Sequence, residues 1–439
     1  MTSAQPIVTV PDGTPRGLPQ RAVHDAMRLL LASAANRDAL SGIEGGGVIE
    51  AFEQRFAEVA GAEFAVAVSS GGMALVVSLY AADIGLGDEV IVSPYGWGQT
   101  VAAVAVVGGT PVFADIDPDS GNLDPAAVAT LVTPRTRAVV ATHMYGCPAR
   151  MDVLQDLCDR HGLILIADAA QALGARIKGR PIGAWGHISC FSLGRRKAVT
   201  TGEGGMICGN DVALRERVIL VSQHPLRAFR ELDDPLMRAS IGEYNLSGRL
   251  SPLAAAIGLA QIAHLERTTR RRNDAAGRLA RATGGSDSFR WQIPLGEGSS
   301  HAWYQLVARY DLRATGGRSR EDVISDLRCL GVPATLGPIR SPIHYRPPFR
   351  VTGTWTPRAF RSRRHVTWNR GSCPHAEQRC LVEDVLVEST SNWEKTPSKR
   401  IAQLIQAFKE VASCGTRDAS VGRLIAYIED TLPTGVNNL

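Results

Sequence analysis

The chain has 439 residues, of which 44% are hydrophobic, and a formal net charge of +5 at pH 7. This length gives room for two or three domains with a large core. The most apolar stretch, FAVAVSSGGMALVVSLYAADIG, is interrupted by SSGG and contains an aspartate, so no membrane span is expected. The N-terminus MTSAQPIVTVPDG has no basic segment followed by an apolar one, so we expect no secretory signal and a cytoplasmic location.

The cysteines and the basic runs exclude further classes of protein. The eight cysteines form no C-x-x-C pair, so neither a structural zinc site nor a redox dithiol is expected, and no metal is predicted. The basic runs ERTTRRRND and RAFRSRRH accompany no known nucleic-acid-binding motif, and we interpret them as a solvated helix face and a polar loop. Neither nucleic acid nor a membrane is therefore expected as a partner.

Helix-like and strand-like stretches alternate along the first half of the chain. After an N-terminal extension over residues 1–40, apolar periodicity predicts helices over residues 49–61 and 151–162. Short runs rich in β-branched residues predict strands between and after them: EFAVAVSS, EVIVSP, TPVFADID, RAVVATHMYG and LILIADAA. This alternation is typical of an α/β fold in which helices cover a mostly parallel sheet.

The pattern changes after this first half. Two more strand-like runs follow, HISCFSLG and GGMICGND, and then a long helical stretch extends from about Pro252 to Ala282. That stretch resembles a connector between domains. We expect a large domain over residues 41–265 and a smaller C-terminal α/β domain over residues 266–439, while the loop from about Arg340 to Ser372 stays unassigned.

Three features of the large domain suggest chemistry. Residues 69–72 (SSGG) are predicted to end a strand and open a helix, where backbone N–H groups bind phosphate, although glycines there also form plain tight turns. Asp168 ends LILIADAA at the sheet edge where ligands bind, although it could equally cap a helix. Lys197 lies between an apolar run and the turn GEGG, and by itself it would be interpreted as a solvated surface lysine.

The combination is more specific than its parts. A strand-end acid, a lysine in CFSLGRRKAVTTGEGG and a glycine turn far upstream together describe a pyridoxal phosphate site. The lysine would form a Schiff base, the acid would keep the pyridine nitrogen protonated, and the glycine turn would take the phosphate. A dehydrogenase of similar architecture finds no support, because no strand is followed by G-x-G-x-x-G.

With these motifs the chain resembles the DegT/DnrJ/StrS aminotransferases. These are pyridoxal phosphate enzymes of fold type I, like aspartate aminotransferase, and they aminate keto-sugars and keto-cyclitols. The likeness covers roughly residues 42–385 and includes VSSGGMAL, GLGDEVIVSPYGW, THMYGCPARMD, ADAAQALGA, CFSLGRRKAVTTGEGGMI and GRLSPLAAAIGLAQI. It implies transfer of an amino group from L-glutamate or L-glutamine to such a ketone, giving an amino sugar or aminocyclitol for an antibiotic or a surface glycan. It also implies a homodimer with shared active sites.

The resemblance implies roles for the residues around the cofactor ring. Lys197 would hold the cofactor and, once an amino donor displaces it, would move the proton. Asp168 would pair with the pyridinium nitrogen. Gln171 would contact the side of the ring hydroxyl and Trp97 would stack on the ring face, although Gln171 could also be a helix cap and Trp97 a plug of the core.

Other residues are implied at the phosphate and at the substrate. Ser192, Gly71 and Gly72 would bind the cofactor phosphate. Arg249 would reach the phosphate of the neighbouring subunit's cofactor. His344 resembles a small-domain histidine near the sugar, although a structural role suits a loop histidine equally well.

Three segments depart from the family's usual pattern, which leaves substrate identity and phosphate binding open. Ser70–Gly72 replaces Ser-Gly-Thr, Ser247–Arg249 replaces Asn-x-Arg, and Tyr95–Trp97 replaces aromatic-Thr-aromatic. The retained lysine argues against the family's dehydratase branch. Two alternatives remain, a non-transaminating pyridoxal phosphate enzyme such as a dehydratase or decarboxylase, and an inactive regulatory homologue. The sequence also does not decide between a nucleotide-linked sugar and a free cyclitol as acceptor.

Overall fold

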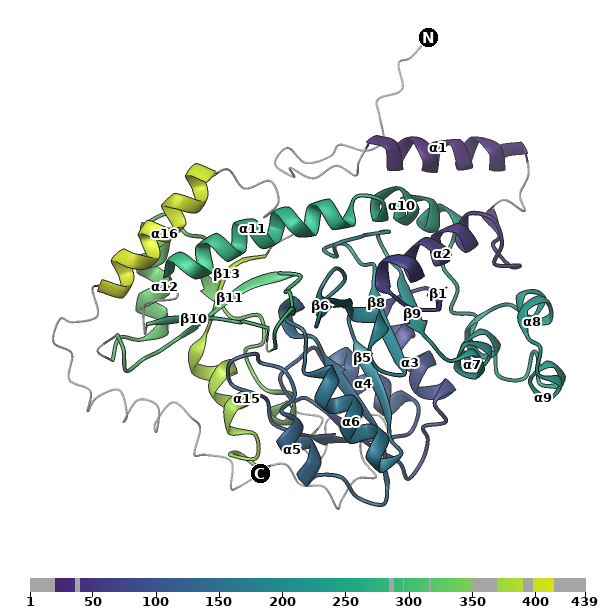
Figure 1. The fold of residues 1–439 in the computed structure, drawn as a ribbon, viewed down its shortest axis with the longest axis horizontal. Coiled ribbons are helices and arrows are strands. Elements are labelled where there is room, and N and C mark those ends of the chain that lie inside the picture. The colour runs from purple at the N-terminus through teal and green to yellow at the C-terminus, as the bar shows by residue number, and fades with distance from the viewer. Residues whose placement is uncertain are drawn as a thin grey trace, which may run out of the picture.

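The computed structural model describes residues 20–35, 40–283, 288–294, 296–315, 317–346, 349, 369–389 and 398–413. Two sheets organise these residues, and helices pack against both (Figure 1). The basic run RAFRSRRH and most of the loop from Arg340 to Ser372 lie outside the described residues.

A seven-stranded sheet forms the larger part, in the order β1-β9-β8-β5-β4-β2-β3. Only β9 runs antiparallel to its neighbours, so the predicted strands and the mostly parallel sheet are confirmed. Helices cover both faces, and nearly every residue of these strands is buried, as expected of a sheet covered on both sides. The strands are β1 (Phe64–Val68), β2 (Glu89–Val92), β3 (Thr110–Phe113), β4 (Thr136–Thr142), β5 (Ile164–Asp168), β8 (Ile188–Ser192) and β9 (Gly205–Gly209).

The helices predicted over residues 49–61 and 151–162 are α2 and α6. Each ends at a glycine in the left-handed region, Gly61 at φ 73° and Gly162 at φ 63°, which a glycine adopts without the strain of a side chain. The helices around the large sheet are α2 (Val48–Ala60), α3 (Gly71–Ala81), α4 (Gly98–Val106), α5 (Pro125–Thr130), α6 (Met151–His161), α7 (Val212–Ser222), α8 (Pro225–Glu231) and α9 (Pro235–Ala239). A short hairpin of β6 (Arg176–Ile177) and β7 (Arg180–Pro181) lies beside them.

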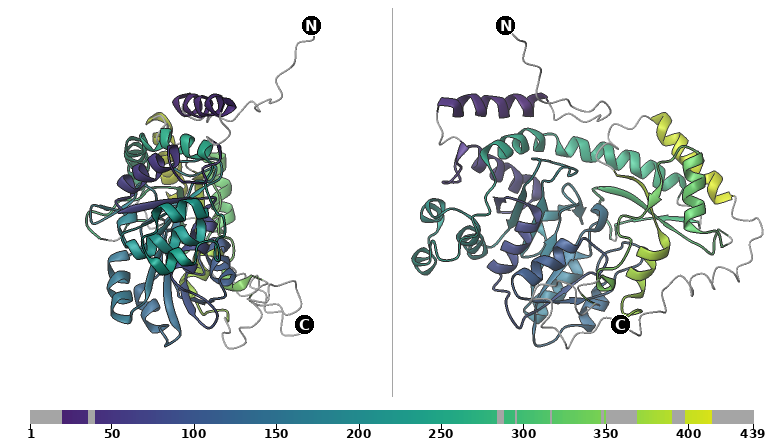
Figure 2. Two further views of the ribbon diagram at one scale, coloured as in Figure 1. Left: turned by 90° about the vertical axis from the view of Figure 1, so that its right-hand side faces the viewer. Right: turned by 180° about the vertical axis from the view of Figure 1, so that it is seen from behind.

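The connector is two helices, whereas the sequence predicted one. α10 (Pro252–Ile262) and α11 (Leu265–Thr283) lie end to end and lead from the large sheet to the small one (Figure 1). The break follows from a tightened turn, in which the N–H of His264 bonds to the carbonyl of Gln261, three residues back. α1 (Gln20–Ala35) lies alongside α10 in every view (Figure 2).

The smaller part is a four-stranded antiparallel sheet in the order β10-β11-β13-β12. It packs against α11, α12 and α16 through a core of its own, which confirms a smaller C-terminal α/β part. The boundary at residue 265 stays a prediction. Its elements are β10 (Phe289–Trp291), β11 (Gln305–Tyr310), β12 (Thr335–Leu336), β13 (Asp384–Ser389), α12 (Arg320–Cys329), α15 (Pro374–Gln378) and α16 (Ser398–Ser413).

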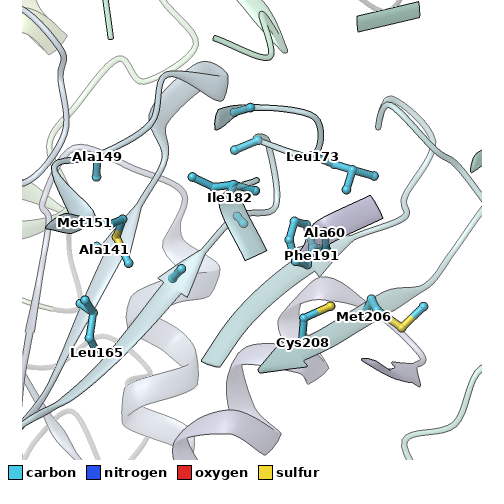
Figure 3. Packing of buried hydrophobic residues seen from close by; sticks show 14 of the residues in the cluster. Ala60, Ala141, Ala149, Met151, Leu165, Leu173, Ile182, Phe191, Met206 and Cys208 are labelled. Carbon is cyan, nitrogen blue, oxygen red and sulfur yellow. The ribbon is translucent and has the colours of Figure 1, made fainter. Parts of the chain in front are cut away.

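The core of the large part lies on both faces of its sheet. On one face, Phe191 of β8 and Met206 and Cys208 of β9 pack near Ala60 of α2 (Figure 3). Within the described ranges, no helix is both long and apolar enough to cross a membrane. The same residues contain no group of three or more His, Cys, Asp or Glu side chains placed to hold a metal ion.

Candidate active site

The predicted site residues gather at one edge of the large sheet. β1, β5 and β8 run in the same direction, so their carboxyl ends meet at this edge. β1 leads into the turn before α3, β5 ends at Asp168 and β8 ends at Ser192. Ligands of open α/β sheets bind at this edge, so the fold brings three of the predicted segments together where a cofactor is expected.

The turn between β1 and α3 has the geometry of an anion cradle. Ser70 caps α3, and its Oγ accepts the N–H of Met73 at 3.0 Å, which leaves other N–H groups of the first turn free of partners within the helix. A Cβ atom on Gly71 would lie 2.7 Å from the Cβ of Ser192, whereas on Gly72 its nearest neighbour would be the Ser70 Oγ at 3.8 Å. Gly71 is therefore required by the close approach of two segments, and Gly72 is not.

Arg249 lies beside this turn. Its backbone pairs with Val68, and the Ser69 N–H bonds to the Gly248 carbonyl at 2.7 Å. The Nη1 atom of Arg249 is buried and has no hydrogen-bond partner among the described residues. Ser247 takes a left-handed backbone at φ 49°. A buried guanidinium nitrogen without a partner fits an anion, and which subunit's phosphate it serves stays a prediction.

Asp168 is a carboxylate with few bonds of its own. It is 6% exposed, and its Oδ2 accepts from the Thr100 Oγ1 at 2.6 Å. Its Oδ1 accepts the Ala170 N–H at 3.3 Å. Burial raises the pKa of the Asp168 carboxyl, against the Thr100 bond and the positive charge of Lys197, which both lower it. The carboxylate is thus held in a fixed orientation with little solvent around it.

Lys197 lies at the same edge and is partly buried. Burial lowers the pKa of its amine to about 8, and the negative charge of Asp168 opposes this shift. Its Nζ lies 4.4 Å from the ring centroid of Tyr304, so the charged amine contacts the face of an aromatic ring. Such an amine is neutral more often at physiological pH than an exposed lysine, which favours its use as a nucleophile and a proton carrier.

Three other predicted site residues differ in their exposure to solvent. Trp97 precedes α4 and is 42% exposed, so its ring is accessible. Gln171 is buried, and its Oε1 accepts the N–H of Tyr145 at 2.7 Å. His344 is fully buried and its Nε2 lies 3.0 Å from the Glu377 Oε1. The roles proposed for these side chains stay predictions.

The sequence did not reveal three residues of this region. Thr100, on α4, orients Asp168 through a hydrogen bond. Tyr304, which directly precedes β11, contacts the Lys197 amine with its ring. Arg346 reaches the turn before α4, where its Nη2 lies 3.5 Å from the carbonyl oxygen of Gly96. Thr100 follows Trp97 by three residues, which was the one available signal, whereas Tyr304 and Arg346 come from distant parts of the chain.

The residues at this edge fit pyridoxal phosphate. The Ser69–Gly72 turn and the unsatisfied Arg249 nitrogen suit a phosphate. The buried Asp168 suits a protonated ring nitrogen, and the Lys197 amine suits the carbonyl carbon. The fold of the protein chain alone therefore brings the phosphate-binding groups, the acid and the amine to one edge of the sheet.

Comparison with known proteins agrees with this geometry. A sequence model of the DegT/DnrJ/EryC1/StrS aminotransferase family matches residues 32–378. GDP-perosamine synthase of Caulobacter vibrioides is 34% identical over 324 residues, which cover 70% of this chain and 80% of the synthase.

Solved structures share the whole fold. An aminotransferase from Psychrobacter cryohalolentis superposes with a TM-score of 0.76 at 29% identity, over 90% of this chain and 98% of that one. DesI, solved in the presence of its TDP-sugar product, superposes with a TM-score of 0.70 at 27% identity, over 93% of each chain.

Proposed function

The chain belongs to the DegT/DnrJ/EryC1/StrS aminotransferase family, whose members depend on pyridoxal phosphate, and on this premise we propose its donor and acceptor. It moves the amino group of L-glutamate or L-glutamine to the ketone of a nucleotide-linked sugar. The product is an amino sugar for a secondary metabolite or a glycan. The observation that carries the reaction is the partly buried Lys197, whose lowered amine pKa and charged neighbour Asp168 occur at one sheet edge.

The cofactor would be held by residues already placed at that edge. When bound, pyridoxal phosphate withdraws electrons from the carbon that carries the amino group. The Ser69–Gly72 turn, Ser192 and Arg249 would bind the phosphate. Asp168, oriented by Thr100, would accept a hydrogen bond from the protonated ring nitrogen. Gln171 and Trp97 would orient the ring from its edge and its face.

Lys197 would carry the proton in both half-reactions. Its neutral Nζ would accept a proton from the donor carbon in the first half-reaction and would deliver a proton to the acceptor carbon in the second. The Tyr304 ring would stabilise the protonated amine between these steps, because the ring face attracts a cation. A single lysine with a pKa near 8 can therefore serve as base and acid in turn.

Two observations support a nucleotide-linked sugar as the acceptor. GDP-perosamine synthase is named for a GDP-linked sugar, and DesI was solved in the presence of its TDP-sugar product. In this chain, Arg195 and Arg196 directly precede Lys197 with exposed side chains, and Arg346 lies beside the turn before α4. Guanidinium groups on these two segments suit the phosphates of a nucleotide.

The same proposal includes a homodimer in the cytoplasm, where amino acid donors and nucleotide-linked sugars are available. Support for the dimer comes from large apolar side chains that are exposed on α8, α9 and the segment after them. They are Leu226, Phe229, Leu236, Tyr244 and Leu246, with exposures from 46% to 81%. Covering these side chains with a second copy would remove them from water.

Mixed dimers test the shared site. We expect Lys197→Ala and Arg249→Gln subunits each to lack activity as homodimers. A mixture that exchanges subunits recovers activity if Arg249 serves the neighbouring site, because one site then has both native residues. No recovery after exchange, shown by a tagged subunit, means that Arg249 serves its own subunit.

The absorption spectrum tests the reaction. The protein with pyridoxal phosphate is titrated with L-glutamate and L-glutamine, and we expect the visible band to be lost as the amine form accumulates. A keto-sugar linked to GDP or TDP should then restore the band, and a free keto-cyclitol should not. Restoration by the cyclitol alone would overturn the acceptor, and a band that neither donor changes would favour a non-transaminating enzyme.

A further inference from the structure

A fully buried polar cluster joins the two parts of the molecule. Asp384 begins β13 of the small sheet, and Arg379 lies five residues earlier. Tyr95 and Tyr145 come from two turns of the large part, after β2 and β4. None of the four side chains has measurable exposure. We name these four residues the interdomain cluster.

Each polar group of the interdomain cluster has a partner. Arg379 donates from Nε to the Asp384 Oδ1 at 2.6 Å and from Nη1 to the Pro118 carbonyl at 3.0 Å. The Tyr95 hydroxyl donates to the Asp384 Oδ2 and lies 3.3 Å from the Tyr145 hydroxyl. Because a phenol has one proton, Tyr145 must donate to Tyr95, which fixes the direction of the chain of bonds.

Charge and ring packing reinforce the same arrangement. The Arg379 guanidinium carbon lies 5.3 Å from the centroid of the Tyr95 ring. The two tyrosine rings meet edge to face, with centroids 6.0 Å apart. An ion pair buried this deeply costs much desolvation, and it persists only with full hydrogen bonding of this kind. Any displacement of one member therefore breaks bonds of the others.

Both tyrosines are directly connected to residues of the candidate active site. Tyr95 is two residues before Trp97, the residue proposed to cover the cofactor ring. The N–H of Tyr145 bonds to the Oε1 of Gln171, the residue proposed at the edge of the ring. The next residue, Gly146, bonds through its carbonyl to the Ala302 N–H, two residues before Tyr304. Three contacts of the cofactor site thus begin at the interdomain cluster.

We propose that Asp384 and Arg379 of the small part are positioning residues, which set the Tyr95–Trp97 and Tyr145–Gly146 turns for cofactor binding. The small domain then acts on the reaction without touching the reacting atoms. Displacing it moves Trp97 and Gln171 together, because Tyr145 bonds to Tyr95, which in turn bonds to the Asp384 carboxylate. This inference rests on the proposed function for the roles of those two residues.

Tyr95→Phe tests the inference with one lost hydroxyl. We expect the apo protein to exchange backbone amides faster over residues 93–100 and 143–148, measured by hydrogen exchange and mass spectrometry. Cofactor affinity should fall about five- to tenfold, the equivalent of one buried hydrogen bond. The visible circular dichroism of the bound cofactor should also change, because that band reports the orientation of the ring.

Asp384→Asn is the second variant and Glu383→Gln is its matched control. Glu383 is the preceding residue, is also buried, and accepts from Arg309 Nε at 2.8 Å, while Arg309 also pairs with Asp119 of the large part. The control therefore weakens an ion pair within the small part, whose arginine also pairs with the large part, without contact to either turn. We expect Asp384→Asn to behave as Tyr95→Phe or more strongly, and Glu383→Gln to leave amide exchange at the turns and the dichroism as in the wild type.

The outcomes separate this inference from the proposed function. If Tyr95→Phe and Glu383→Gln lower stability alike and neither changes turn exchange, affinity or dichroism, the cluster is only structural and the inference fails. If wild-type protein gives no cofactor band, the proposed function fails instead. The exchange measurement on apo protein still reports whether the cluster orders the two turns.

Discussion

Asp168 and Asp384 are both buried carboxylates near a basic side chain, and their surroundings differ. Asp384 bonds directly to Arg379 at 2.6 Å and to Tyr95. Asp168 accepts hydrogen bonds from the hydroxyls of Thr100 and Thr142 and from a backbone N–H, and no ion pair joins it to Lys197, although both residues are described. Asp168 and Lys197 nevertheless interact electrostatically, because the charge of each residue shifts the pKa of the other.

This difference separates a structural pair from a pair arranged for a ligand. Around Asp384 the protein supplies all the bonds, so the charges are neutralised within the fold. Around Asp168 and Lys197 the basic group is left without a bonded acid, and Arg249 nearby has a buried nitrogen without a partner. Incomplete satisfaction of buried polar groups is costly, which suggests that a bound molecule completes this site.

Lys197→Ala should have the largest effect. Removing the amine removes both covalent attachment and proton transfer, so we expect transamination to fall by about 10³-fold or more. Borohydride treatment followed by mass spectrometry should find cofactor on wild-type Lys197 and none on the variant. Transamination by the variant at the wild-type rate would refute the assignment.

Arg379→Met should lower stability strongly, in addition to the loss of cofactor affinity expected of a positioning residue. It leaves Asp384 buried without its cation, and we expect the free energy of unfolding to fall by about 3–5 kcal/mol. Urea unfolding of the apo protein measures this. Lys197→Ala is the control, because removing an amine that no acid pairs with should cost the fold little. Equal losses in both variants would contradict the distinction between the two pairs.

Asp168→Asn should lower kcat while leaving the free energy of unfolding largely unchanged, in contrast to Arg379→Met. The amide keeps the shape but cannot stabilise a protonated ring nitrogen, so kcat should fall by about 10²-fold. Apo stability should be kept or should rise slightly, because burial disfavours the charged carboxylate. The comparison fails if urea unfolding shows a large loss of stability while kcat is unchanged.

Gly71→Ala and Gly72→Ala are a matched pair at the phosphate turn. A methyl on Gly71 would lie 2.7 Å from the Ser192 Cβ, whereas one on Gly72 meets nothing closer than 3.8 Å. We expect Gly71→Ala to lose cofactor affinity by about tenfold through displacement of the two segments, and Gly72→Ala to change it by less than about twofold. Titration with pyridoxal phosphate compares them. Equal affinities would contradict the close approach.

The pH dependence should give the smallest effect. The Lys197 amine has a pKa of about 8, so its neutral form increases as the pH rises to 8 and changes little beyond about pH 9. The rate of covalent cofactor uptake by the apo protein should follow this curve. The neutral fraction of an exposed lysine would continue to increase up to about pH 10.5. A rate that still rises past about pH 9.5 would therefore contradict the lowered pKa of Lys197.

The sequence alone determined the local parts of this protein. Each predicted strand of the large sheet was confirmed, because continuous apolar runs suit a sheet covered on both sides. Asp168 was found at a strand end, and residues 69–72 were found between a strand and a helix. These features depend on neighbouring residues, so periodicity and glycine positions were sufficient to predict them.

Only the tertiary structure decided which distant residues meet. Tyr304 is more than a hundred residues from Lys197, and Asp384 is 289 residues from Tyr95, so no local pattern could relate them. The sequence also predicted one connector helix where a tightened turn at His264 makes two. Contacts of this kind depend on how packed elements approach one another, and the burial that shifts the pKa of Lys197 arises from the same packing.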